Sequence, residues 1–95
     1  MTEPTYEQVK KFWDYWGVEP YRAYPTGVEY PDIDLNNLFE DAVSAMDFWL
    51  ASKEKTKRVG VLVQYQGRCS GLVFEDTFDL ALFWAIWEVM EVSND

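Results

Sequence analysis

The segment Phe78-Asp-Leu-Ala-Leu-Phe-Trp-Ala-Ile-Trp-Glu-Val-Met90 is apolar around almost its whole circumference when it is written as a helix. Asp76 or Thr77 is placed to cap its start, and the pattern continues to about Val92. A helix that is hydrophobic on every face is buried on more than one side. We therefore expect this helix either to be the central element of the fold or to have one flank covered by a partner.

Residues 57–75, which precede this helix, predict a β-hairpin turning at Gln66-Gly67. The expected register places Val63 opposite Ser70 and Val61 opposite Leu72. One face of the hairpin then carries Val59, Val61, Val63, Tyr65, Leu72 and Phe74, and the other carries Gly60, Leu62, Gln64, Cys69, Gly71 and Val73. Because a lone hairpin has two open edges, pairing of two hairpins across a two-fold axis is expected to complete the sheet.

A second helix is predicted from Asp34, a good N-cap, to about Lys53. The residues that follow a helical period in this range are Leu35, Leu38, Phe39, Ala42, Val43, Met46, Trp49 and Leu50.

The first predicted helix runs from about Thr5 to Trp16, with the capping-box spacing of Thr5 and Gln8 at its start and Gly17 after its end. Thr2 followed by Pro4 offers a competing start. Residues 18–33 contain three prolines, so we expect an irregular segment with a short strand around 28–30.

The expected fold is therefore a single α+β domain, residues 1–95, with the order helix, loop, helix, β-hairpin, helix. It is a small two-layer domain in which an antiparallel sheet of two or three strands packs on helices. The chain length fits one domain, and its 48% hydrophobic and 18% aromatic residues exclude a disordered chain.

Two segments resemble a known family: Asp34-Leu-Asn-Asn-Leu-Phe-Glu-Asp-Ala-Val43, and Phe78-Asp-Leu-Ala-Leu-Phe-Trp-Ala-Ile-Trp-Glu-Val89 after the hairpin. They are similar to small phage and mobile-element proteins of the phage ABA-sandwich domain group. The resemblance covers roughly residues 30–92 and implies helices packed on a small antiparallel sheet. It implies a third strand, for which residues 28–30 are the candidate, and no catalytic residues.

Charge and composition narrow the classes of function. A net charge of −9 disfavours direct binding to nucleic acid or to anionic membranes, because both need clustered Lys and Arg. The charge fits a basic protein partner, or solubility alone. No apolar run approaches the length of a membrane span, and the N-terminus has no signal-peptide pattern. With one cysteine and no disulfide framework, we expect a cytoplasmic protein.

The chain has no histidine, which removes the commonest general base and metal ligand. Cys69 is expected to be a buried, inert thiol, since no histidine can activate it. Asp32 and Asp34 are the first place to look for an ion, although capping of the second helix explains Asp34. A second acidic cluster lies before and within the start of the last helix: Glu75, Asp76 and Asp79. We expect its carboxylates to stabilise the helix N-terminus rather than to act as catalytic acids or bases. We therefore predict that the protein is not an enzyme and that it binds no cofactor and no metal ion.

The basic run from Lys53 to Arg58 is expected to be a solvated loop. The leading functional hypothesis is a non-catalytic interaction module of phage or mobile-element origin, acting as a homodimer through its sheet edge or its last helix. Its predicted interface consists of Trp13, Trp16, Tyr21, Tyr24, Tyr30, Leu82 and Ile86. The alternative is an acidic mimic of nucleic acid that inhibits a host nuclease or DNA-binding protein. Its predicted acidic face consists of Glu3, Glu7, Asp14, Glu40, Asp41 and Asp47.

Overall fold

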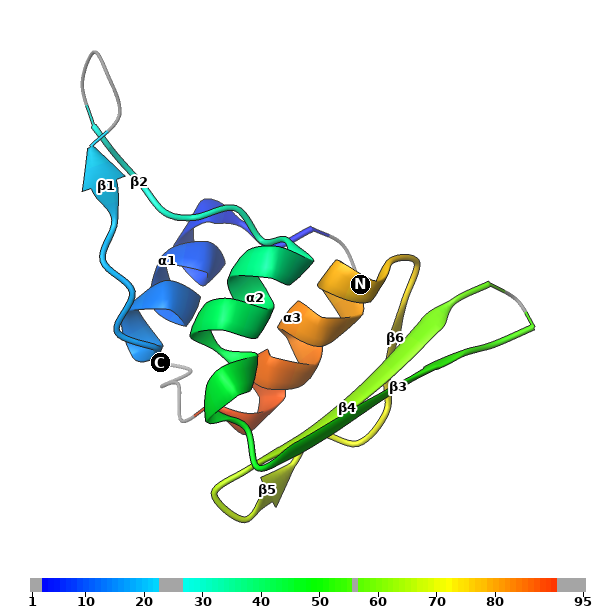
Figure 1. Cartoon of the computed structure of the whole chain (residues 1–95). Helices are drawn as coiled ribbons and strands as arrows, with labels where there is room; N and C mark the ends of the chain where they lie inside the picture. The colour runs from blue at the N-terminus through cyan, green and yellow to red at the C-terminus, as the bar shows by residue number, and fades with distance from the viewer. Residues whose placement is uncertain (1–2, 23–26, 56, 91–95) are drawn as a thin grey trace.

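A computed structural model describes residues 3–22, 27–55 and 57–90 of the chain. Their elements, in order, are α1 (Tyr6–Tyr15), β1 (Tyr21–Arg22), β2 (Val28–Glu29), α2 (Leu35–Asp41), the 3-10 helix η1 (Val43–Ala45), β3 (Phe48–Lys53), β4 (Val59–Tyr65), β5 (Arg68–Cys69), β6 (Val73–Glu75) and α3 (Phe78–Val89). The predicted α+β class is confirmed: a layer of helices packs on an antiparallel sheet (Figure 1).

The main sheet has four strands, with β4 at its centre. Strand β3 pairs with one edge of β4, and β5 and β6 pair with the other edge. All three helices lie on the same side of this sheet (Figure 1). A separate two-stranded ribbon, β1 with β2, projects from the other end of the helical layer. The candidate strand at 28–30 is therefore a strand, but it pairs with β1 and does not join the main sheet.

Helix α3 is the central element of the chain, as one of the two sequence interpretations expected. Every residue from Ala81 to Ile86 is buried within the chain. The ring of Phe83 lies 4.6 Å from the ring of Phe12 on α1, and Val61 and Val63 of β4 belong to the same core. The helix ends at Val89 rather than near residue 92, because Met90 takes an extended conformation.

The predicted second helix is wrong beyond Asp41. Helix α2 begins after its Asp34 cap as predicted, but η1 interrupts it and Met46 is extended. Residues 48–53 then form β3, antiparallel to β4. The physical reason is tertiary: strand pairing with β4 satisfies the backbone of this segment and outweighs its local helical period.

The predicted hairpin turn is confirmed, and its register is correct only beside the turn. Gln66 and Gly67 both have positive φ, and Tyr65 lies opposite Arg68. Further along, Val61 lies opposite Val73 instead of Leu72, so the second strand contains one extra residue. The hydroxyl of Ser70 accepts a hydrogen bond from the Val63 amide, which breaks the regular ladder here.

This extra residue exchanges the predicted faces of β6. Val73 and Glu75 face the helices with the buried valines of β4, whereas Phe74 lies on the opposite face, against Gly60. The left-handed backbone of Gly71, at φ +73°, permits the bend.

Helix α1 follows its sequence signals closely. The Thr5 hydroxyl accepts from the Gln8 amide while the Gln8 side chain accepts from the Thr5 amide, so the capping box is confirmed. The segment after α1 is held to it by Trp13, whose indole Nε1 donates to the Pro31 carbonyl at 2.8 Å.

Candidate functional site

Strand β3 is exposed along its whole length. It forms an edge of the main sheet: within the described residues it pairs only with β4. The relative exposures of its first three side chains, Phe48, Trp49 and Leu50, are 47%, 38% and 39%. An exposed apolar edge strand offers unpaired backbone groups to another chain, and natural proteins usually cover or charge such edges.

The backbone direction of β3 follows from one hydrogen bond. The Glu54 amide donates to the Arg58 carbonyl at 2.9 Å, so the even-numbered positions of β3 face β4. Residues alternate along an antiparallel ladder, and Trp49, Ala51 and Lys53 therefore direct their N–H and C=O groups to the open edge. These groups are a template for one further strand.

The face of the sheet that points away from the helices is also apolar. We call it the outer sheet face, formed by Phe48, Leu50, Leu62 and Phe74. Leu50 lies directly opposite Leu62, and Phe74 lies opposite Gly60 and covers it. No described helix covers this face (Figure 1). Leu72, which precedes β6, adds a side chain that is 50% exposed.

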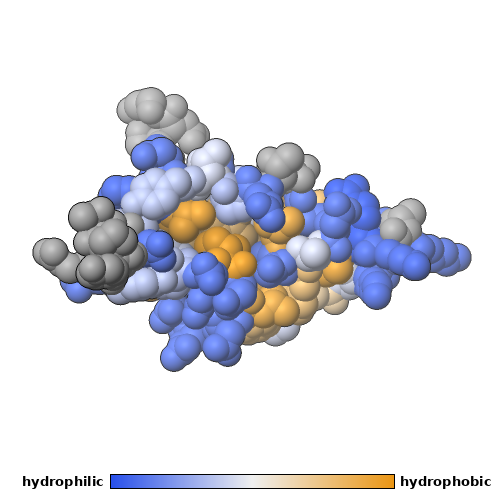
Figure 2. All heavy atoms as spheres, turned by 90° about the horizontal axis from the view of Figure 1, so that it is seen from above, coloured by the Kyte–Doolittle hydropathy of each residue, from blue (hydrophilic) through white to orange (hydrophobic). Residues whose placement is uncertain are grey.

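A second candidate surface lies on the helical layer, and we call it the upper groove. It consists of two adjoining cavities of about 550 and 450 Å³ that share Pro4, Val9, Asp32 and Ile33. The first is also lined by Tyr6, Glu29, Tyr30 and Pro31, and the second by Glu3, Thr77, Asp79 and Leu80. From above, hydrophobic residues are exposed in the middle of a hydrophilic surface (Figure 2).

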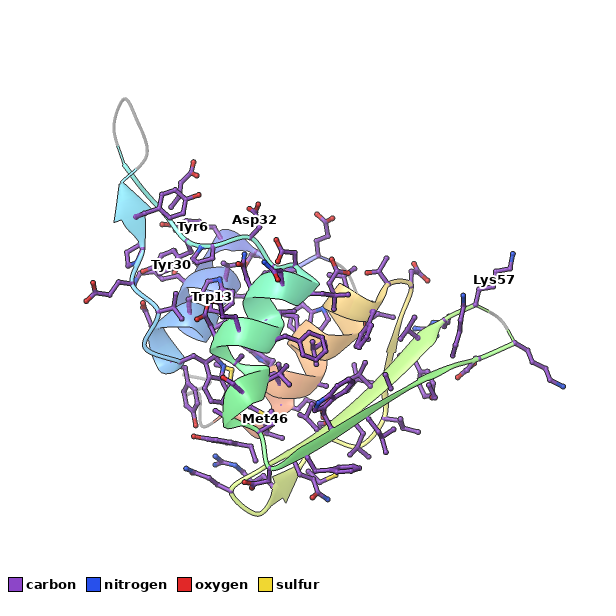
Figure 3. The ribbon with its side chains drawn as sticks, in the orientation of Figure 1. Tyr6, Trp13, Tyr30, Asp32, Met46 and Lys57 are labelled. Carbon is purple, nitrogen blue, oxygen red and sulfur yellow. The ribbon has the colours of Figure 1, made fainter. Side chains whose placement is uncertain are left out.

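The upper groove is lined by four carboxylates and otherwise mostly by apolar or aromatic side chains. The four carboxylates belong to Glu3, Glu29, Asp32 and Asp79, and no Lys or Arg is among the described lining residues. Figure 3 shows Tyr6, Tyr30 and Asp32 near one another at this end of the molecule. Such a groove suits a ligand that combines a cation with apolar atoms.

Polar contacts hold the wall of this groove in place. The Tyr30 hydroxyl donates to Asp14 Oδ1 at 3.1 Å, and Lys10 Nζ donates to Asp14 Oδ2 at 2.9 Å. The hydrogen bond from Lys10, joined by that from Tyr30, lowers the pKa of Asp14. On the neighbouring ribbon, the Tyr21 hydroxyl donates to Glu29, which raises the pKa of Tyr21.

The structure does not bring the predicted interface residues together on one surface. Trp13, Leu82 and Ile86 are fully buried within the chain, so their assignment to an interface is wrong. Trp16 is half-buried and packs on Tyr65. The remaining predicted members divide as follows: Tyr21 is 53% exposed on β1, Tyr30 belongs to the upper groove, and Tyr24 lies outside the described residues.

The structure also distributes the residues of the predicted acidic face over several elements. Asp47 is not on a helix, because it lies just before β3, where its carboxylate accepts from the Gln66 amide. Glu40 and Asp41 are on α2, Glu7 and Asp14 are on α1, and Glu3 is in the upper groove.

The remaining candidates are single residues. Cys69 is exposed, so the prediction of a buried thiol is wrong: it pairs with Gln64 on the outer side of the sheet. Asp34 caps α2 as expected. Glu75 is 3% exposed in β6 and does not belong to the start of α3. In the part of the chain that the structure describes, no group of three or more acidic or cysteine side chains is placed to hold a metal ion.

Sequence reasoning missed the main exposed surface, since it placed residues 48–50 in a helix. The segment Phe48-Trp-Leu-Ala51 is an unbroken apolar run without period-2 alternation, and such a short run cannot be assigned to strand or helix by periodicity alone.

Comparison with known proteins finds no matching family model, no similar curated protein and no similar solved structure. The resemblance to the phage ABA-sandwich domains therefore stays a prediction. Among the described helices, none has the length and apolar character needed to cross a membrane.

Proposed function

We propose that this chain is a non-catalytic protein-interaction module. The observation that carries the proposal is strand β3, whose first three residues expose large apolar side chains at an edge that pairs with no other described strand. Adding a strand to an open sheet edge is a common way for a protein to hold a partner: the backbone supplies affinity and alternate side chains supply specificity.

The outer sheet face enlarges this surface. Phe48 and Leu50 belong both to β3 and to the outer sheet face, so a partner strand along β3 also meets the apolar residues beside it. Exposed apolar side chains that form a continuous patch mark interaction sites more often than side chains that are scattered singly. The non-catalytic part rests on a sequence with no histidine and one cysteine.

Site-specific photo-cross-linking in the cells that produce the protein tests this function. A benzoylphenylalanine in place of Phe48 is expected to give a discrete covalent adduct with a protein. The matched control replaces Glu7, an exposed residue of α1 on the helical layer, and is expected to give none. Absence of an adduct from position 48, or the same adduct pattern from both positions, contradicts the proposal.

A second candidate function concerns the upper groove and a basic partner. Four carboxylates line this groove together with apolar and aromatic side chains, and the described lining has no Lys or Arg. The groove suits a Lys or Arg side chain of a basic protein, because the carboxylates attract the cation and the apolar atoms accept its aliphatic stem. An acidic inhibitor of a nucleic-acid-binding protein is one form of this function.

Nuclear magnetic resonance with a short lysine- and arginine-rich peptide tests the groove. We expect salt-sensitive shifts at Val9, Ile33 and Leu80, and we expect Asp32→Asn to weaken them. Glu40→Gln removes one exposed charge outside the groove and is the control for net charge. Equal weakening by both variants means that the peptide responds only to overall charge, and it contradicts a site in the groove.

A further inference from the structure

The edge of β3 is complementary to itself. We infer that β3 pairs antiparallel with β3 of a second copy of this chain, with Leu50 on the two-fold axis. This inference rests on the proposed function, because it names the partner of the same strand.

The backbone of β3 permits this pairing without rearrangement. A two-fold axis perpendicular to the sheet at Leu50 places Trp49 of one copy opposite Ala51 of the other, and the reverse. Both residues direct their N–H and C=O groups to the open edge, so each opposed pair can exchange two hydrogen bonds. The N–H and C=O groups of Leu50 point toward β4. In the new ladder the two Leu50 residues therefore form a non-hydrogen-bonded pair, in which side chains approach closely.

Charge is compatible with this register but does not select it, because a register centred on Ala51 would also set Asp47 opposite a lysine, Lys55. Side-chain size favours the Leu50 axis, since it sets the bulky Trp49 opposite the small Ala51 and brings the two Leu50 side chains together. Asp47 and Lys53 lie on either side of Leu50 at equal separations along the chain. Antiparallel pairing about Leu50 therefore sets the backbone of Asp47 in each copy opposite Lys53 of the other, while the Asp47 carboxylate keeps its hydrogen bond to the Gln66 amide of its own chain. Figure 3 shows Met46 and Lys57 at opposite ends of the β3–β4 hairpin, so the lysine-bearing end of one copy meets the acidic start of β3 in the other.

The two-fold rotation about Leu50 explains why a second copy fits the open edge of β3 better than an unrelated strand. It joins the two sheets into one continuous sheet and keeps the helices of both copies on one side. The two outer sheet faces become neighbours, with Phe48 and Leu50 of both copies at the junction. Each copy supplies the apolar side chains and the backbone hydrogen-bonding groups that the edge of the other copy leaves unpaired.

Disulfide trapping tests the register. The background is Cys69→Ser, which removes the exposed native thiol. Leu50→Cys places two cysteines opposite each other, at a Cα separation of about 4.5 Å, close enough for a disulfide bond. The matched control Phe48→Cys is on the same strand and face and is similarly exposed. Its two copies lie about 13 Å apart along the paired strands, too far for a disulfide bond.

We expect mild oxidation to convert the Leu50→Cys protein mostly to a covalent dimer, at least tenfold faster than the Phe48→Cys protein. Equal rates, or faster cross-linking of Phe48→Cys, overturn the register.

A pair of proline variants tests the edge itself. Ala51→Pro removes an N–H that faces the open edge, whereas Leu50→Pro removes one that faces β4. By light scattering, we expect the parent to be a dimer and Ala51→Pro a monomer whose circular dichroism matches that of the parent. Leu50→Pro is expected to unfold at a lower denaturant concentration than Ala51→Pro. A parent that is monomeric, or an Ala51→Pro protein that still dimerises, overturns the inference.

The outcomes separate this inference from the function on which it rests. A monomeric parent with a heterologous adduct from position 48 overturns self-pairing and leaves the interaction module standing. A monomeric parent without any adduct overturns both.

Discussion

Gly60 lies beneath the ring of Phe74 on the outer sheet face. A Cβ atom at residue 60 would lie 2.5 Å from Cε1 of that ring, so the ring must move before any side chain fits. We predict that Gly60→Ala lowers the free energy of unfolding by about 1–3 kcal/mol, the usual cost of inserting atoms into a packed site. Chemical denaturation followed by tryptophan fluorescence measures the change.

The control for this prediction is the same substitution in a Phe74→Ala background. Without the ring, Gly60→Ala is expected to be neutral or slightly stabilising, because alanine restricts the unfolded chain more than glycine does. An equal loss in both backgrounds would show that backbone conformation, rather than the Phe74 ring, sets the cost.

Asp14 makes a small, pH-dependent contribution to stability. Hydrogen bonds from Lys10 and Tyr30 lower its pKa below the ordinary value of 3.8. A carboxyl group with a depressed pKa in the folded state stabilises the fold above the unfolded pKa, and the contribution is lost as the pH falls through the folded pKa. We predict that an NMR titration of Asp14 gives a midpoint below 3.8.

The matched variant is Lys10→Met, which removes the larger cause of the shift. The titration midpoint of Asp14 is expected to rise toward 3.8 in this variant. An unchanged midpoint would mean that Tyr30, not Lys10, sets the pKa.

At the scale of elements, the two longer helices offer a comparison of caps. The Thr5 hydroxyl accepts from a backbone amide at the start of α1, whereas the Thr77 side chain makes no such cap to α3. We predict that Thr5→Ala lowers the free energy of unfolding by about 1 kcal/mol. Thr77→Ala should cost less, and urea denaturation of both variants measures the difference. A larger loss from Thr77→Ala would contradict the capping argument.

These caps also show what a sequence can reveal about an element. The capping box of Thr5 and Gln8, the Asp34 cap and the turn at Gln66-Gly67 were all predicted, because each depends on residues close together in the chain. The prediction failed where distant partners decide. Trp49 fits a helical period, yet its segment pairs with β4, and its ring packs 5.0 Å from that of Phe39.

The candidate site was harder to predict than the fold for the same reason. Phe48 and Leu50 are exposed because β3 lies at a sheet edge and none of the described helices covers its outer face, and neither fact is encoded locally. Leu82 and Ile86 were expected at an interface because α3 is apolar all round. The chain itself covers the middle of that helix, Ala81 to Ile86, on all sides, which a count of apolar residues cannot foresee.

At the scale of the whole molecule, charge opposes the dimer that β3 favours. Each copy carries a net charge of −9, and the chain extends 45 Å along its longest axis. Most charges of one copy therefore lie several Debye lengths from those of the other at 0.1 M salt, where the Debye length is about 10 Å. The repulsion between the copies is strong at low salt and largely screened at this salt concentration. Any contact between Asp47 of one copy and Lys53 of the other would be exposed, and exposed ion pairs contribute only about 0–1 kcal/mol each.

We therefore predict that raising the salt concentration from low to physiological values tightens the dimer, because screening removes more repulsion than attraction. Sedimentation equilibrium at several salt concentrations measures the dissociation constant. The melting temperature of the parent should also rise with protein concentration, since dimerisation stabilises only the folded chain. The Ala51→Pro monomer should show no such concentration dependence. A dimer that weakens steadily with salt would mean that the Asp47–Lys53 contacts, rather than the backbone ladder of β3, hold the two copies together.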